Sequence, residues 1–242
     1  MVRSAIQLYT LRNVDRPFTE VLELVADAGF DGVEFAYRVT DEDPEEVRAT
    51  LEETGLAVAG AHVGIDGLED DFAETVAFYE ELGVENVVIP WLDPENFESD
   101  AAVADAAERV EAVGERLADR DLSLHYHNHD HEYTDLDGET GWDAFIDATS
   151  CGIELDLGLA LAAGDDVIER LRSLGERSAL VHLKDYDVSA GHSVPVGEGD
   201  LDLDAVAEAV ADNDSDWLIY EYEGEDPLAT LETAAERTND LC

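Results

Sequence analysis

The sequence predicts an α/β fold, a single (β/α)8 TIM barrel that spans residues 1–242. Short apolar runs alternate with amphipathic stretches eight times along the chain. Eight strand–helix units in 242 residues match such a barrel in number and in length. Because no linker rich in Pro, Gly or Ser divides the chain, we expect one domain.

The predicted strands are short runs rich in β-branched and apolar residues. A doubly wound open sheet is the alternative, but it would more often follow its first strand with a glycine-rich turn. The segment Tyr9–Asn13 contains no glycine, which favours the barrel. The predicted strands are Ala5–Tyr9, Gly32–Phe35, Ala57–Val63, Asn86–Pro90, Leu122–Asn128, Gly152–Asp156, Ala179–Leu183 and Trp217–Tyr222.

Helices are predicted between the strands, where apolar residues recur at helical spacing. In Phe18–Ala28 they occupy positions 18, 21, 22, 24 and 25. Gly29, Gly55 and Gly83 follow the first three predicted helices, as C-terminal cap glycines do. The other predicted helices are Glu45–Thr54, Asp70–Leu82, Ala101–Ala118, Trp142–Ala148, Val167–Leu174, Leu203–Val210 and Pro227–Thr238.

Charge is the most unusual feature of the composition. The chain has 61 acidic and 13 basic residues, a formal net charge of −48, although its 45% hydrophobic residues can fill a core. The acidic residues are spread over the polar faces of the helices, as in Asp41–Glu46. Such a solvated acidic shell is typical of proteins from a haloarchaeon-like source, where a salty cytosol screens the repulsion. It argues against nucleic acid and anionic membranes as partners.

The two cysteines, Cys151 and Cys242, cannot define a disulfide framework, which favours a reducing compartment. The first residues run directly into a predicted strand, so we expect no signal peptide. An apolar run of about 18 residues, long enough to span a bilayer, is absent from the sequence. We therefore expect a cytoplasmic protein with no membrane partner, and the sequence leaves open a homo-oligomer.

Four of the seven histidines lie within His125–His131, where they alternate at period two. Alternate side chains of a strand share one face, so His125, His127 and His129 should project together. Imidazole binds divalent transition metals and carries protons near neutral pH. The stretch therefore predicts one wall of an active site, and solvated histidines at a strand end are the alternative.

Four predicted strands in succession, the fifth to the eighth, place His127, Asp156, His182 and Glu221 near their C-terminal ends, where barrel enzymes carry their functional groups. Buried acids in a strand are costly unless they are paired or bind a metal. Each residue alone could be a core polar group with a satisfied partner, but four together favour a metal site. The mixed nitrogen and oxygen donors suit one divalent metal, Mn, Co, Mg, Fe or Zn.

The same rule makes other strand ends and adjoining loops candidates for the site. Lys184 is the only lysine of the chain and is therefore expected to have a specific role, with a salt bridge to Asp185 or Glu221 as the alternative. The other candidates are Gln7, Tyr9, Arg12, Glu34, Tyr37, His62, Trp91, Asn128, His129, Glu154 and Glu198.

Several motifs, spread over nearly the whole chain, resemble the xylose isomerase-like TIM barrels, the sugar phosphate isomerase/epimerase family. They are specific for this family and for its Tyr-His-Asn-His branch, but they do not specify a substrate. The motifs are Ile6–Arg12, Gly32–Phe35, Ala61–Val63, Tyr126–Asp130, Glu154–Asp156, Val181–Asp185 and Val196–Asp202.

The resemblance implies one divalent metal held by Glu, Asp, His and Glu from the fifth to the eighth strands. The last three ligands fall on Asp156, His182 and Glu221, whereas the first falls on His127, a departure from the usual glutamate. In epimerases of the family the two glutamates also move the substrate proton, and that relay is not available here in the same form. Either His127 binds the metal and another group is the base, or the site is rearranged around Glu154 or His129.

The resemblance implies a metal-dependent sugar isomerase or epimerase that transfers a proton next to a carbonyl through a metal-stabilised enediolate. Glu221 or His129 is the expected base, and Glu34, His62 and Lys184 are expected to assist it. A sugar or polyol substrate would contact Gln7, Tyr9, Arg12, Trp91, Asn128, Glu154 and Glu198.

Three other functions are weighed against this one. A metal-dependent dehydratase or lyase that acts on a keto-sugar or keto-inositol is the first alternative. A non-catalytic sugar-binding barrel is the second. DNA repair of the AP-endonuclease type is disfavoured, because the chain has a net charge of −48 and shows no basic groove.

Overall fold

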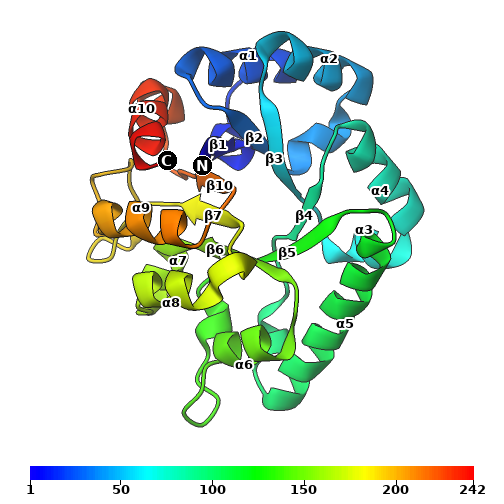
Figure 1. Cartoon of the computed structure of the whole chain (residues 1–242), viewed down its shortest axis with the longest axis vertical. Coiled ribbons are helices and arrows are strands. Elements are labelled where there is room, and N and C mark those ends of the chain that lie inside the picture. Colours follow the sequence, from blue (N-terminus) through cyan, green and yellow to red (C-terminus); the bar gives the residue numbers. More distant parts are fainter.

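The computed structural model describes residues 1–242 except for the side chain of Tyr37, so the expectation for Tyr37 lies outside the described residues. Eight parallel strands close into a barrel in the order β1-β10-β7-β6-β5-β4-β3-β2, and helices surround it (Figure 1). The predicted fold class is therefore confirmed. The barrel strands are β1 Arg3–Gln7, β2 Gly32–Phe35, β3 Ala57–His62, β4 Asn86–Ile89, β5 Ser123–His127, β6 Gly152–Asp156, β7 Leu180–Leu183 and β10 Trp217–Tyr220.

Most outer helices match the predicted ranges, because each has one apolar stripe that packs on the barrel. The outer helices that correspond to predicted ones are α1 Phe18–Ala28, α2 Pro44–Thr54, α4 Phe72–Glu81, α5 Asp100–Ala118, α6 Gly141–Ala148, α8 Val167–Leu174, α9 Leu203–Asp212 and α10 Leu231–Leu241. Short 3-10 helices lie at η1 Leu8–Leu11, η2 Tyr37–Asp41, η3 Pro94–Phe97, η4 His131–Tyr133, η5 Gly175–Arg177 and η6 Pro227–Ala229.

Two predicted helices differ from the structure. The helix expected at Asp70–Leu82 begins at Phe72 as α4, because Asp71 has non-helical dihedral angles, and a short helix that was not predicted, α3 Ile65–Asp70, precedes it. The helix expected from Pro227 begins only at Leu231, after η6.

Two elements near the barrel mouth were not predicted. Helix α7, Leu157–Ala163, follows β6 without an intervening loop. A two-stranded antiparallel hairpin joins β8 Tyr186–Asp187 to β9 His192–Ser193. Its strands are too short to show an alternating pattern, so nothing in the sequence predicts it.

The barrel interior changes from apolar to charged along the strands. Ala5, Ala59, Val88, Leu180, Trp217 and Ile219 form an apolar cluster of their own. Two residues further along β7 and β10 the same face carries His182 and Glu221, because strand side chains alternate. The charged groups therefore lie at the C-terminal end of the barrel. Among the described residues, no helix has both the length and the apolar character needed to cross a bilayer.

Candidate active site

A cavity of about 550 Å³ opens at the C-terminal ends of the strands. It is lined by residues from the ends of all eight barrel strands or from the segments that follow them. Tyr9, His62, Trp91, His127, His129, Lys184 and Glu221 were predicted from the sequence, and Ala36, Gly64, Pro90, Leu159 and Glu223 complete the lining. A cavity of this size holds a drug-sized or sugar-sized ligand.

The structure brings together the four residues that the sequence proposed as metal ligands. One potential ligand atom from each of His127, Asp156, His182 and Glu221 lies within 4.8 Å of the others, and all four residues are buried. The His182 Nδ1 atom lies 3.0 Å from Glu221 Oε2, and His127 Nε2 lies 3.9 Å from Asp156 Oδ2. These residues come from β5, β6, β7 and the end of β10, which are neighbours in the barrel.

A second set of donors lies beside the first and uses the opposite nitrogens of the same two imidazoles. His127 Nδ1 lies 3.2 Å from Glu154 Oε2, and His182 Nε2 lies 3.1 Å from that same oxygen. His182 Nε2 is also 2.7 Å from Glu34 Oε2, and His62 Nε2 lies 2.8 Å from Glu154 Oε2. Each imidazole therefore has Asp156 or Glu221 near one nitrogen and Glu154 near the other.

Lys184 lies among the carboxylates of the first set. Its Nζ atom is 3.1 Å from Asp156 Oδ2, 3.1 Å from Glu221 Oε2 and 2.8 Å from Glu223 Oε1. Burial alone would lower the pKa of Lys184, but these three negative charges outweigh burial and hold it well above its usual value. The ammonium group is therefore a fixed positive charge beside two of the proposed metal ligands.

The surroundings give His127 and His182 different protonation states. Burial lowers the pKa of His127 well below its usual value, and the neighbouring His182 and His62 lower it further. Burial acts the same way on His182, but Glu154 and Glu34 outweigh it and raise the pKa well above the usual value. His127 is therefore neutral at neutral pH, with a lone pair to donate, whereas His182 is protonated.

The two glutamates beside these histidines, Glu34 and Glu154, also differ in pKa. Burial would raise the pKa of Glu34, but the charges of His62 and His182 lower it to about 2. Burial raises the pKa of Glu154 to about 7, and the negative charge of Glu34 contributes to this rise. Gln7 donates from Nε2 to Glu34 Oε2 over 2.7 Å, so it lies below the cavity rather than in its lining.

Asn128 and helix α7 orient Asp156. The Asn128 Oδ1 atom accepts a hydrogen bond of 2.8 Å from the Asp156 backbone N–H. The Asp156 Oδ1 atom accepts a bond of 2.8 Å from Leu159 N and thereby caps α7. Its Oδ2 atom is left to face Lys184. The capping role explains why α7 follows β6 directly, and this helix brings Leu159 to the cavity, which the sequence analysis missed.

The histidine-rich stretch divides into separate roles. His129 lies in the cavity lining with its ring centroid 4.6 Å from that of Trp91. His125 lies deeper, with Nε2 3.3 Å from Asn86 Oδ1, and it does not line the cavity. His131 Nε2 lies 2.9 Å from the Leu92 carbonyl oxygen. The expected shared face therefore holds for His127 and His129 at the cavity, and His125 lies beneath them.

Five predicted substrate contacts lie outside this cavity lining: Gln7, Asn128 and Glu154, described above, and Arg12 and Glu198. The Arg12 guanidinium packs 4.2 Å from the Tyr9 ring and donates to the Tyr9 carbonyl over 2.8 Å, so it supports Tyr9. Glu198 is exposed on a loop that Asp185 fixes, because the Asp185 Oδ2 atom accepts from Gly197 N over 2.7 Å and from Gly199 N over 3.0 Å. The motif around Glu198 therefore has a structural contact that the sequence did not reveal.

Comparison with known proteins agrees with this architecture. A model of the xylose isomerase-like TIM barrel family matches residues 22–241. The chain belongs to this family. The structure of a sugar phosphate isomerase/epimerase from Parabacteroides distasonis ATCC 8503 superposes with a TM-score of 0.85 at 18% identity and covers 100% of this chain and 96% of its own.

Two further relatives of the xylose isomerase-like barrel differ in their reactions. The 3-dehydro-D-guloside 4-epimerase of Escherichia coli (strain K12) is 26% identical over 239 residues, which cover 86% of this chain and 88% of the epimerase. The structure of the probable 3-DHS dehydratase AsbF from Bacillus anthracis superposes with a TM-score of 0.74 at 15% identity and covers 98% of each chain. Proteins that resemble this chain are therefore named both as an epimerase and as a probable dehydratase.

Proposed function

We propose that this protein is a divalent-metal-dependent isomerase or epimerase of sugars or sugar derivatives, which moves a proton on the carbon next to a carbonyl. The convergence of His127, Asp156, His182 and Glu221 beside Lys184 in one cavity carries this proposal. The names of the epimerase relatives support a sugar carbonyl as the reacting group.

The four residues fit a divalent metal in their chemistry. Two imidazoles and two carboxylates are the donors that Mn²⁺, Co²⁺, Fe²⁺ and Zn²⁺ accept. His127 is neutral and can donate its lone pair, while Asp156 Oδ2 is buried and faces the Lys184 ammonium at 3.1 Å. When bound, the metal would polarise the carbonyl and so acidify the adjacent C–H bond. Because His182 is protonated without a metal, binding should release a proton and strengthen as pH rises.

Glu221 and His129 are the proposed proton carriers. Epimerisation needs one group to remove a proton from one face of the carbon and another group to return it on the opposite face. Glu221 and His129 both line the cavity, and β7 and β6 separate their strands in the barrel. Burial and Lys184 lower the pKa of His129 to about 3, so it is unprotonated and only weakly basic at neutral pH. The Lys184 ammonium would stabilise negative charge on the substrate oxygen.

Proton exchange tests this function directly. The purified protein, loaded with Mn²⁺ or Co²⁺ in molar KCl and D₂O, is incubated with a panel of ketoses and keto-glycosides, and NMR measures deuterium incorporation next to the carbonyl. We expect exchange in the wild type, and a loss of about 10²-fold or more in Glu221→Gln and His129→Gln. Glu69→Gln, a carboxylate outside the cavity lining that pairs with Arg109, is the control. No exchange with any compound, together with no bound metal, would refute the proposal.

Dehydration is the second candidate, and the position of Lys184 favours it. The Lys184 ammonium could hold a departing β-hydroxyl group by a hydrogen bond while the base passes the abstracted proton to that oxygen, so that water leaves and the reaction is an elimination. The same incubations separate the two reactions, since elimination produces a conjugated ketone with strong ultraviolet absorbance. A non-catalytic sugar-binding barrel would show neither exchange nor elimination.

A further inference from the structure

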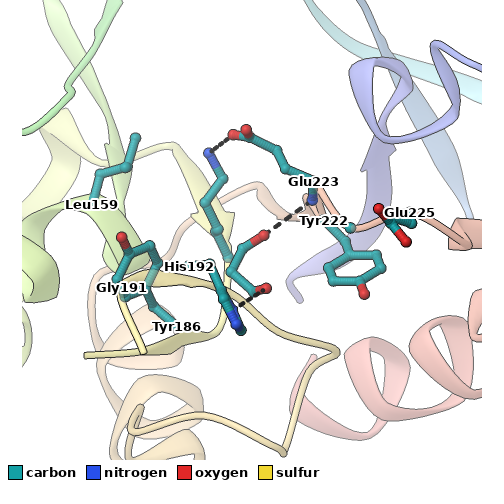
Figure 2. A pocket seen from close by; sticks show the side chains of 10 residues that line it. Leu159, Tyr186, Gly191, His192, Tyr222, Glu223 and Glu225 are labelled. Atoms are coloured by element: carbon teal, nitrogen blue, oxygen red, sulfur yellow. Dashed lines mark hydrogen bonds and ion pairs between the residues drawn. The ribbon is translucent and has the colours of Figure 1, made fainter. Parts of the chain in front are cut away.

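A second cavity, of about 570 Å³, adjoins the first one at the barrel mouth. The two cavities share Leu159, Lys184 and Glu223 in their linings. We call the second one the hairpin cavity, because the hairpin β8–β9 forms one side and residues 222–225 after β10 form another. Figure 2 shows Leu159, Tyr186 and Gly191 on one side and Tyr222, Glu223 and Glu225 on the other.

The walls of the hairpin cavity are held in place by specific contacts. Ser193 Oγ accepts a hydrogen bond of 3.1 Å from Glu223 N, so the hairpin is attached to the segment after β10. The Tyr186 backbone N–H donates to Asp185 Oδ1 over 3.0 Å. A Cβ atom at Gly224 would lie 1.9 Å from the Tyr222 hydroxyl oxygen, so the Tyr222 side chain occupies space that only glycine leaves free. The cavity is therefore a built feature of the fold.

The chemistry of this lining suits a neutral ring that carries many hydroxyl groups. Tyr186 and Tyr222 offer aromatic surface, and the carboxylates of Glu223 and Glu225 can accept hydrogen bonds from hydroxyl groups. Lys184 is the only lysine or arginine in the described lining, and three carboxylates already contact it. A phosphate or a carboxylate group would therefore meet repulsion here, whereas a glycosyl ring would not.

We propose that the substrate is a glycoside that occupies both cavities. Its carbonyl-bearing ring lies in the central cavity and its second, neutral glycosyl ring lies in the hairpin cavity, against Tyr186 and Tyr222. The glycosidic linkage passes the Lys184–Glu223 ion pair, which lines both spaces. The placement of the first ring rests on the proposed proton transfer. Binding of the second ring can be measured without turnover.

The test measures binding of disaccharides and of free hexoses to the full chain in molar KCl by saturation-transfer NMR. The probes are disaccharides of glucose, galactose and mannose with different linkages, together with the three hexoses. We expect at least one disaccharide to bind about tenfold or more tightly than its component hexoses. Tyr186→Ala should raise the Kd of that disaccharide about three- to tenfold and leave the Kd of the hexoses unchanged.

Two further variants sharpen the result. Val188→Ala changes an exposed side chain on the same hairpin that does not line the cavity, so it should leave every affinity unchanged. Gly224→Ala should displace the Tyr222 ring and weaken only the disaccharide. Melting curves confirm that each variant is folded. Equal affinity for disaccharides and hexoses throughout the panel, an absence of binding, or equal losses for both classes in Tyr186→Ala would each overturn the proposal.

Turnover separates this inference from the proposed function. If the protein binds disaccharides through Tyr186 but catalyses no proton exchange, the glycosyl site is supported and the isomerase function is refuted. The opposite outcome is equal proton exchange in free ketoses and in keto-disaccharides, both in the wild type and in Tyr186→Ala. It would support the isomerase function and refute the glycosyl site.

Discussion

At the residue scale, Lys184 places a buried positive charge beside the carboxylate oxygens that we propose as metal ligands. Removing one partner of a buried ion pair costs about 3–5 kcal/mol. In Lys184→Met, Asp156, Glu221 and Glu223 lose their counter-charge, so we expect a lower Tm in the absence of metal. Mn²⁺ should restore much of that loss by supplying another cation. Thermal unfolding with and without Mn²⁺ measures both effects, and a Tm that the metal does not raise would contradict the shared use of these oxygens.

Glu154 offers a second test at this scale, because its Oε2 atom lies within 3.2 Å of nitrogens of His62, His127 and His182. Removing a carboxylate that orients a metal-binding imidazole typically lowers the metal affinity about 10–100-fold. We expect Glu154→Gln to weaken Co²⁺ binding by that factor in isothermal titration. The matched control is Glu132→Gln, since Glu132 is equally buried but accepts from Tyr126 Oη and His129 N instead. Equal losses in both variants would assign Glu154 a general structural role.

At the scale of elements, the close approach of α7 to β7 fixes the position of Lys184. A Cβ atom at Gly158 in α7 would lie 2.3 Å from the Lys184 carbonyl oxygen, whereas one at Gly114 in α5 would meet Leu124 Cδ2 at 3.4 Å. We expect Gly158→Ala to destabilise the fold by about 1–3 kcal/mol through overpacking and to weaken metal binding. Gly114→Ala should be neutral or stabilise by about 0.5–1 kcal/mol. Urea unfolding compares the two, and a harmless Gly158→Ala would show that α7 can move without cost.

The barrel elements could be predicted because each has a clear periodic pattern. All eight predicted barrel strands occur, with ends shifted by one or two residues at most. The position of the four proposed ligands followed from the rule that strand ends meet at one edge. Other relations could not be predicted, because they depend on side-chain direction across the barrel. The contact of Glu154 with both imidazoles, the fixing of the Glu198 loop by Asp185, and the hairpin cavity are of this kind.

At the scale of the whole molecule, the net charge of −48 should make folding depend on salt. Charge repulsion acts over about 30 Å at 0.01 M salt but over about 3 Å at 1 M. We expect the urea midpoint to rise steeply with KCl between these concentrations. Sucrose, which favours compact states without screening charge, is the control. A midpoint that KCl and sucrose raise equally, or that KCl leaves unchanged, would show that screening is not the cause.

Because Lys184 is buried, its chemical modification can report when the barrel mouth opens. Within these 242 residues the lysine is 2% exposed, so an acylating reagent can reach no lysine amine in the folded state. Acylation of that amine then requires the barrel mouth to open or the chain to unfold. Mass spectrometry after timed exposure to such a reagent should therefore measure how often the C-terminal end of the barrel opens, and a tightly bound ligand should slow the acylation.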